Sequence, residues 1–590
     1  MKLVKEIFSA SVKRFIASWC AVAFLLLVIF ERDFTSPSFA ADFSTVSTVL
    51  MILSFFIFAT LVRLFVKSDI FDNLFLLISI LAYAYTLVYK HEDLYFYIGI
   101  MVVVAILSIY LFGNDQFKLE GKKISPVLVY IIVGAAGLFC FGYIALQTVM
   151  RHITYSTPNF DFGIFVQMFH NMATTLLPDT TCERDMMLSH FAVHTSPIFY
   201  LILPIYWLFP SPLTLQIAQA AIVASGIVPL VLICRHIKLP TLVTGALGVA
   251  YAFYPAVYGG CFYDIHENCF LLPLILWLFY FIEKEKYIPA FVFAFLTLCV
   301  KEDAFIYVLF CGLYLILSRK KYKFGITISV LSVVYFSVIA FLMTKFGNGI
   351  MEGRFSNYMG SDDSGLLSVV VNLLRNPALL FSESFDSEKL LFAIQMLLPI
   401  GFLPFMTRNV SRLTLLLPFL LINIMPDYVY QHSIYFQYVF GSTAFLFYAA
   451  ALNLADMKGG YRRTVAAYSL VACILGFTAM ISDRGYYLAK YEATKEDIAI
   501  MDEAIECVPD GVTVKASSFF LPHLANRRYI YDFGRSKHDT EYIAIDLRYE
   551  DGKHEEAQIE VYNEKGYEIV YYAKGLALIV RNPFFVGESE

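Results

Sequence analysis

The chain has 590 residues, of which 59% are hydrophobic and only 16% are charged. Soluble domains carry about 25% charged residues, so this composition excludes an ordinary soluble protein and predicts a membrane protein with many spans. The formal net charge of −5 provides no strong field that would attract a polyanion, which excludes nucleic acid as a partner.

Apolar runs long enough to cross roughly 30 Å of hydrocarbon recur along the first 485 residues. The first run, residues 15–30, follows a basic N-terminus; it resembles a signal peptide, but we expect an uncleaved helix that starts in the cytoplasm. About thirteen to sixteen spans are predicted, including runs near 15–30, 46–66, 70–89, 94–112, 125–149, 212–234, 240–259, 269–283, 324–346, 389–406, 411–426, 433–453 and 464–482.

Two regions do not fit a single straight span. Pro204 and Pro210 interrupt residues 195–210, which are therefore predicted to dip into the membrane rather than cross it. Residues 287–318 lie between two basic clusters and are too many for one ordinary helix. Two short helices are predicted to meet at Lys301-Glu302-Asp303, where polar backbone is tolerated beside a cavity.

The distribution of Lys and Arg among the loops predicts a cytoplasmic N-terminus and places the loops 150–194 and 347–388 outside. After about residue 490 the sequence becomes soluble in character, with one helical stretch and several short strand-like runs. The predicted fold is an all-α polytopic transmembrane bundle with a small extracytoplasmic α+β domain. We expect N-terminal helices in 1–120, a core in 121–485 and the soluble domain in 490–590.

Two polar motifs occur in the first predicted outer loop. Asp161, in NFDFG, could only cap a helix, or it could act as a base or a cation ligand. His190 and His194 are four residues apart in SHFAVHTSP and could contact a phosphate or sugar, or pack at the interface. A zinc site is disfavoured because no HExxH glutamate accompanies them and the ten cysteines show no CxxC pair.

A third motif, YDIHEN, lies between two spans. Its residues Asp264, His266 and Glu267 could supply a base, a hydrogen-bond donor and a cation ligand, or form an ordinary polar loop. His432, in DYVYQHSIYFQ, is a candidate substrate contact within a tyrosine cluster that could equally be an interfacial belt.

The fourth motif, Lys301-Glu302-Asp303, would be costly at membrane depth unless it pairs internally or lines a wet cavity. The lysine could contact a phosphate directly. The two carboxylates could hold a divalent cation that bridges a lipid phosphate, or one of them could be a general base.

Six motifs follow one another within a resemblance that covers roughly residues 125–580, namely FDFGIFVQ, HTSPIFYLILPIYWLFPSPLTLQIAQA, YDIHENCF, VKEDA, YQHSIYFQYV and VPDGVTVKASSFFLPHLANRRYIYDF. In this order they resemble the domain of unknown function 2079 family of predicted membrane proteins. That family is similar to a branch of the GT-C glycosyltransferases, which take sugars from polyprenyl-phosphate donors at the outer face of the membrane. The resemblance implies that Asp161 lies near the substrate, although it stands alone where GT-C enzymes often have two acids.

The sequence and the resemblance together predict a glycosyltransferase that uses a polyprenyl-phosphate-linked sugar donor in the cell membrane. The sequence leaves the cofactor open. Mg²⁺ or Mn²⁺ is a candidate, held by Asp161, Glu302 and Asp303. Alternatives are a transporter or lipid flippase that uses the buried charges as a relay, and a noncatalytic scaffold. The candidate catalytic residues are Asp161, Glu302 and Asp303, and the candidate substrate-binding residues are His190, His194, Asp264, His266, Glu267, Lys301 and His432.

Overall fold

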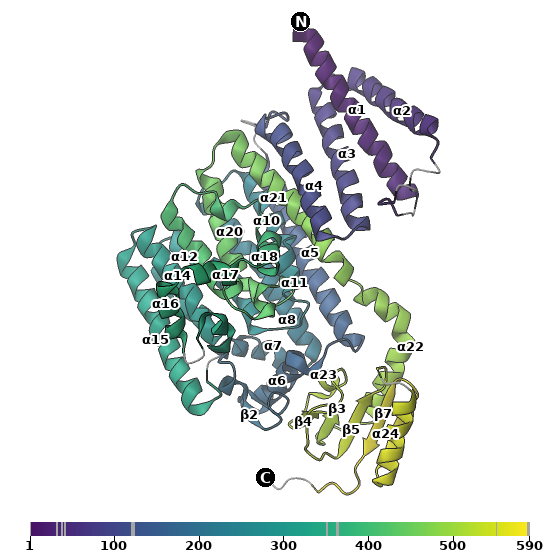
Figure 1. Ribbon diagram of the computed structural model, residues 1–590, viewed down its shortest axis with the longest axis vertical. Helices are drawn as coiled ribbons and strands as arrows, with labels where there is room; N and C mark the ends of the chain where they lie inside the picture. The colour runs from purple at the N-terminus through teal and green to yellow at the C-terminus, as the bar shows by residue number, and fades with distance from the viewer. Residues whose placement is uncertain are drawn as a thin grey trace.

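The computed structural model describes residues 2–30, 33–36, 39, 43–119, 124–349, 352–360, 365–549 and 552–586. It is a bundle of helices with a small domain of strands and helices at the C-terminal end (Figure 1), which confirms the predicted fold class. The predicted boundary between the first two parts, at residues 120 and 121, lies outside the described residues, as do positions 350, 351 and 361–364 of the predicted loop 347–388.

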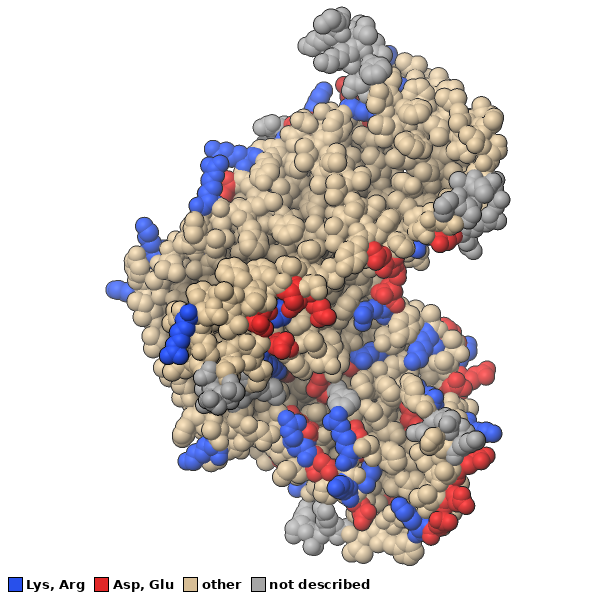
Figure 2. Space-filling model, in the orientation of Figure 1, with Lys and Arg blue, Asp and Glu red and all other residues tan. Residues whose placement is uncertain are grey.

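Ten helices among the described residues are long and apolar enough to cross a membrane, which agrees with the prediction of a multi-pass membrane protein. Figure 2 shows a broad area without charge over the helices and charged side chains of both signs gathered on the C-terminal domain. The ten candidate spans are Ala10–Ile29, Thr45–Val66, Asp69–Lys90, Leu94–Gly113, Pro126–Ile153, Pro212–His236, Thr241–Gly259, Tyr322–Phe346, Val439–Asp456 and Gly459–Met480.

The first four helices lie beside the rest of the bundle, at the upper right in Figure 1. Helix α4 joins them to the core, because the Tyr97 hydroxyl donates a 2.8 Å hydrogen bond to the Ala472 carbonyl of α21. Only 6% of α2 is buried, so nearly all of its surface is available to lipid. The first four helices are α1 (Lys2–Ile29), α2 (Thr45–Val66), α3 (Asp69–Lys90) and α4 (Leu94–Ser108).

The core of the bundle is built around α20, which is buried over almost its whole length. Its small residues, such as Gly441 and the run Ala449–Ala451, allow neighbouring helices to approach closely, as is usual inside membrane bundles. The long core helices are α5 (Pro126–Ile153), α8 (Pro212–Ser225), α9 (Ile227–His236), α10 (Thr241–Ala252), α12 (Leu271–Glu283), α15 (Tyr322–Phe346), α20 (Val439–Asp456) and α21 (Gly459–Met480).

The predicted pair of short helices between the two basic clusters is confirmed. Helix α13 (Tyr287–Leu298) ends before the ionisable cluster, and α14 (Phe305–Leu317) begins after the single 3₁₀ turn η7 (Glu302–Ala304). Lys301 is fully extended, with φ −162° and ψ 161°, so the chain turns there instead of continuing as a helix.

Segment 195–210 does not form a spanning helix. It consists of the 3₁₀ helix η5 (Pro197–Leu201) and the six-residue helix α7 (Leu203–Leu208), which is only about 9 Å long. This confirms that the segment is not a single spanning helix, and its dip into the membrane stays a prediction. The predicted spans 389–406 and 411–426 are likewise built from short pieces, namely α18 (Ser387–Leu397), η9 (Leu403–Phe405), η10 (Val410–Leu416), α19 (Leu417–Phe419) and η11 (Leu420–Ile424).

Many of the segments that join the long helices are short and irregular. Between α5 and α8 the chain forms a π-helical turn, a helix and a two-stranded ribbon in which Asp179 pairs with Ser189. These joining elements are η3 (Asn159–Gly163), α6 (Ile164–Thr175), β1 (Asp179–Thr180), β2 (Leu188–Ser189), η4 (His190–Ala192), α11 (Pro255–Gly259), η6 (Glu267–Phe270), η8 (Glu352–Tyr358), α16 (Leu366–Arg375), α17 (Ala378–Ser384) and η12 (Val429–His432).

The C-terminal domain contains a five-stranded mixed sheet with the order β4-β3-β5-β7-β6. Strand β3 is parallel to β4 and β5, whereas β7 is antiparallel to β5 and β6. The central strands β5 and β7 are almost fully buried, as their apolar sequences predict. The elements are α22 (Tyr487–Glu506), β3 (Val514–Ala516), α23 (Leu521–Leu524), β4 (Ile530–Asp532), β5 (Tyr542–Asp546), α24 (Gly552–Glu564), β6 (Glu568–Ala573) and β7 (Ala577–Arg581).

Specific hydrogen bonds dock this domain onto the segment after α5. The Gln167 side chain donates to the Arg528 carbonyl at 2.8 Å, and the Ile530 amide donates to the Thr181 hydroxyl at 3.1 Å. The Asn159 amide group donates to Asp532 Oδ2 at 2.8 Å. The domain therefore holds the loop that carries Asp161.

Candidate active site

A cavity of about 930 Å³, here called the polar cavity, lies where the bundle meets the C-terminal domain. Six of the ten residues proposed from the sequence line it, although they come from four separate segments. These six are Asp161, His190, His194, His266, Glu267 and Lys301.

Asp161 and His266 form an ion pair on the wall of the polar cavity. Asp161 Oδ2 lies 3.1 Å from His266 Nε2, and the other ring nitrogen lies 3.3 Å from the Asp264 carbonyl oxygen. The side chain of Asp161 remains 39% exposed, whereas that of His266 is 4% exposed. The carboxylate is thus held by the imidazole and still open to a molecule in the cavity.

The ion pair determines the charge of both groups. Burial disfavours the charged carboxylate, but the attraction and hydrogen bond of His266 outweigh it, so the pKa of Asp161 lies below its usual value. Burial also disfavours the imidazolium, yet Asp161 raises the pKa of His266 above its usual value. Each partner therefore favours the charged form of the other.

The backbone at Asp161 and Asp264 is unusual. Their φ angles are 68° and 86°, in the left-handed region that non-glycine residues seldom adopt. Aspartate tolerates this region better than most residues, and a strain of about 1–3 kcal/mol persists where the surrounding contacts hold the residue, as the ion pairs of both side chains do here.

Glu267 and Lys301 form a second, fully buried ion pair. Lys301 Nζ lies 2.6 Å from Glu267 Oε1, and the two side chains are 3% and 1% exposed. The pair joins the start of α12 to the junction between α13 and α14. The two opposite charges compensate each other. The positive charge of the predicted Lys301-Glu302-Asp303 cluster is therefore neutralised by Glu267, which lies outside that cluster.

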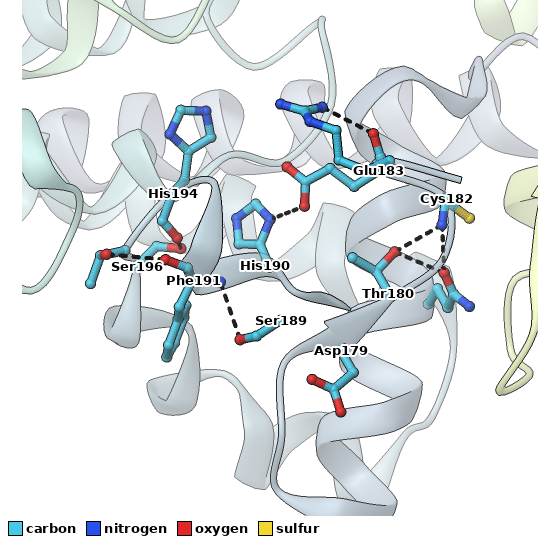
Figure 3. A network of polar contacts seen from close by, with 12 residues as sticks. Asp179, Thr180, Cys182, Glu183, Ser189, His190, Phe191, His194 and Ser196 are labelled. Carbon is cyan, nitrogen blue, oxygen red and sulfur yellow. Dashed lines mark hydrogen bonds and ion pairs between the residues drawn. The ribbon is translucent and has the colours of Figure 1, made fainter. Parts of the chain in front are cut away.

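The two histidines of the SHFAVHTSP motif pair with different carboxylates. His190 Nδ1 lies 2.9 Å from Glu183 Oε2 (Figure 3), and His194 Nδ1 lies 2.9 Å from Glu302 Oε1. Burial opposes the imidazolium of His190, but the charge of Glu183 raises its pKa above the usual value. Among the described residues, the buried His190 Nε2 has no hydrogen-bond partner.

The other four predicted residues do not line the polar cavity. Glu302 supports His194 and also accepts a 3.2 Å hydrogen bond from the Thr195 amide, so it acts on the cavity through His194. Asp264 is buried between Arg151 and Gln216, at 2.6 and 2.7 Å, which is a structural role. Asp303 and His432 are half-buried, and neither lines the polar cavity.

Several cavity residues were not predicted from the sequence. Arg184, Arg354 and Arg535 add three cations to Lys301, and Glu183 adds a carboxylate. Arginines in predicted outer loops run against the usual concentration of basic residues in the cytoplasm, and this signal could have found Arg184 and Arg354. Arg535 gives no such signal because it lies in the soluble domain.

An aromatic wall faces the charged groups. The Arg354 guanidinium carbon lies 5.0 Å from the centre of the Tyr428 ring and 5.1 Å from that of Tyr438, which fixes the cation against an aromatic surface. The wall consists of Tyr263, Tyr428, Tyr430, Phe436 and Tyr438.

The candidate cation ligands do not come together. No group of three or more His, Cys, Asp or Glu side chains in the described part of the chain could hold a metal ion. Asp161 forms an ion pair with His266, and Glu302 forms one with His194. The donor set therefore does not fit the divalent cation considered from the sequence.

The chain is similar to a protein family and to solved structures. A family model described as predicted membrane protein (DUF2079) matches residues 151–578, whereas no curated protein matches. Among solved structures, the chain is similar to ArnT from Cupriavidus metallidurans bound to undecaprenyl phosphate, with 12% identity, a TM-score of 0.47 and coverage of 79% of this chain and 100% of that one. For ArnT from the same organism in the apo state, the identity is 10%, the TM-score 0.40 and the coverage 76% and 98%. The family match includes every residue that lines the polar cavity.

Proposed function

The chain belongs to the DUF2079 family of predicted membrane proteins, and from its polar cavity we propose that it is a membrane glycosyltransferase. The donor is a polyprenyl-phosphate-linked sugar, and transfer takes place at the outer face of the membrane. The cavity, rather than the likeness to ArnT, supports this proposal.

One observation carries the proposal: an accessible carboxylate shares a single cavity with several cations and an aromatic wall. Asp161 can accept a proton from an acceptor hydroxyl. Lys301 and Arg354 suit a phosphate, because cationic donors bind its oxygens through strong charge-assisted hydrogen bonds. The aromatic rings offer flat apolar surfaces for the carbon-bound hydrogens of a sugar.

In the proposed reaction, the acceptor oxygen attacks the anomeric carbon of the donor sugar. A carbon–oxygen bond forms to the acceptor while the bond to the lipid phosphate breaks, and the phosphate leaves with the electron pair. The acceptor proton passes to Asp161, and the leaving phosphate is stabilised by Lys301, Arg354 and His190. His266 orients Asp161, and Glu302 orients His194.

We also propose the orientation and the division of the chain predicted from the sequence. The N-terminus lies in the cytoplasm, and the C-terminal domain lies outside and closes one wall of the polar cavity with Arg535. Residues 121–485 then form the catalytic core, and residues 1–120 lie beside it as N-terminal helices.

Purified protein given a polyprenyl-phosphate sugar and an acceptor extract should release polyprenyl phosphate. Asp161→Asn should lower the rate about 10²–10⁴-fold, the usual contribution of general acid–base catalysis. Asp179→Asn is a matched control, because this carboxylate of the same segment points away from His190 and His194 (Figure 3). Lipid binding without phosphate release by the wild type would contradict the proposal and favour a transporter; equal rates in Asp161→Asn and wild type would remove Asp161 as the base.

A further inference from the structure

A second hollow, here called the α5–α9 groove, lies on the side of the bundle between α5 and the α8–α9 pair. Its volume is about 650 Å³. It follows the first half of α5, whereas the polar cavity lies beyond the last residue of that helix. The lining is Tyr130, Val133, Gly134, Gly137, Leu138, Phe141, Ala221, Ala224, Ser225, Ile227, Val228, Val231, Leu232 and Arg235.

Small residues keep this groove open. A Cβ atom at Gly134 would meet no heavy atom within 4 Å, and one at Gly137 would lie 3.5 Å from Ile227. Behind the groove α10 closes the gap, because a Cβ atom at Gly248 would touch both Val133 and Val231 at 3.0–3.4 Å. The hollow therefore opens to the side of the bundle and does not continue through it.

The length of the groove matches one leaflet. Tyr130 and Phe141 are eleven residues apart on a continuous helix, which corresponds to about 16 Å. Half of a hydrocarbon core of about 30 Å has the same length. An apolar chain that descends from one membrane surface to the middle of the bilayer would fill it.

The groove carries a positive charge at one end only. The Arg235 guanidinium carbon lies 5.4 Å from the centre of the Tyr130 ring. None of the ion pairs between described residues involves Arg235, and exposed Lys238 follows three positions later. A cation at the end of an apolar groove between helices is complementary to an anionic lipid head group.

We propose that the α5–α9 groove is a binding site for an anionic diacyl phospholipid. One acyl chain lies along Gly134 and Leu138, and the phosphate contacts Arg235. This site is separate from the polar cavity and does not depend on the proposed reaction.

The test uses the full-length protein purified in a neutral detergent and native mass spectrometry with added phosphatidylglycerol or phosphatidylcholine. The wild type should retain phosphatidylglycerol in preference to phosphatidylcholine. Arg235→Gln should reduce that preference about fivefold, the effect of one basic residue near an anionic lipid. Gly134→Leu should abolish the preferential adduct, because the new side chain enters the groove without a backbone clash.

Gly142→Leu is the matched control, since it adds the same side chain to α5 at another position with no atom within 4 Å. It should retain the wild-type preference. Both leucines replace glycine in a helix, which favours helix formation, so loss of fold does not explain a difference between them. Equal retention of the two lipids by the wild type, or an unchanged preference in Gly134→Leu, would overturn the proposal. Stronger binding of undecaprenyl phosphate than of phosphatidylglycerol would overturn the assignment of a phospholipid.

Discussion

At the scale of single residues, His266 controls the protonation of Asp161. Asp161 must be ionised to accept a proton, so activity should fall as the pH drops through its pKa. The attraction of His266 lowers that pKa below its usual value. His266→Gln removes the positive charge, the pKa of Asp161 rises, and the acid limb of kcat/KM moves to higher pH.

The pH profile of lipid-phosphate release measures this shift. His190→Gln serves as the control, because His190 pairs with Glu183 and lies in the same cavity. Its acid limb should stay at the wild-type position even where KM rises. An identical displacement of the limb in both variants would show that His266 has no specific influence on Asp161.

At the scale of elements, the Glu267–Lys301 pair joins the start of α12 to the α13–α14 junction. Removing one partner of a buried pair leaves an uncompensated charge, which typically costs about 3–5 kcal/mol. Glu267→Gln should therefore lower the unfolding temperature markedly. The double variant Glu267→Leu/Lys301→Met should regain most of that stability, since apolar replacement of a buried pair is often neutral.

Thermal unfolding of the two variants in the same detergent tests this prediction. The exposed pair Lys321–Glu285 gives the control, because Lys321 Nζ lies at a similar distance, 2.7 Å, from Glu285 Oε1. Lys321→Met should change the stability by no more than about 1 kcal/mol, because solvent already screens that pair. A Glu267→Gln protein as stable as the wild type would mean that Lys301 finds another partner.

The break between α13 and α14 could be predicted because its cause is local. Three consecutive ionisable residues cannot continue an apolar helix, and two basic clusters mark its ends. The role of Glu302 could not be predicted in the same way. Its partner His194 lies 108 positions earlier, and only the packed structure shows that they meet at 2.9 Å.

At the scale of the whole molecule, the apolar runs and loop polarity predict the membrane bundle and the soluble domain. They also identify Asp161, His266, Glu267 and Lys301, because charged or polar groups in such surroundings stand out. The contribution of Arg535 depends on how the C-terminal domain docks through contacts such as Gln167 to Arg528. Contacts of this kind leave no periodic pattern in the sequence, so the place of Arg535 in the cavity wall could not be predicted.

The proposed orientation of the chain can be tested with two single cysteines. Lys574 is exposed in the C-terminal domain, and Lys286 is exposed between α12 and α13. Helix α12 starts just after Glu267 and α13 ends just before Lys301, and both of these residues line the polar cavity. Lys286, which connects the other ends of the two helices, therefore lies at the opposite end of the bundle. A membrane-impermeant maleimide should label Lys574→Cys in intact spheroplasts and should not label Lys286→Cys.

Permeabilised membranes should allow both cysteines to react, which shows that the lack of labelling at Lys286→Cys comes from the membrane and not from burial. The unsubstituted protein measures the background of its ten native cysteines. If Lys286→Cys reacts in intact spheroplasts and Lys574→Cys does not, the polar cavity faces the cytoplasm. Transfer from an outward-facing lipid donor would then be impossible, because Asp161 and Lys301 would lie on the wrong side of the bilayer.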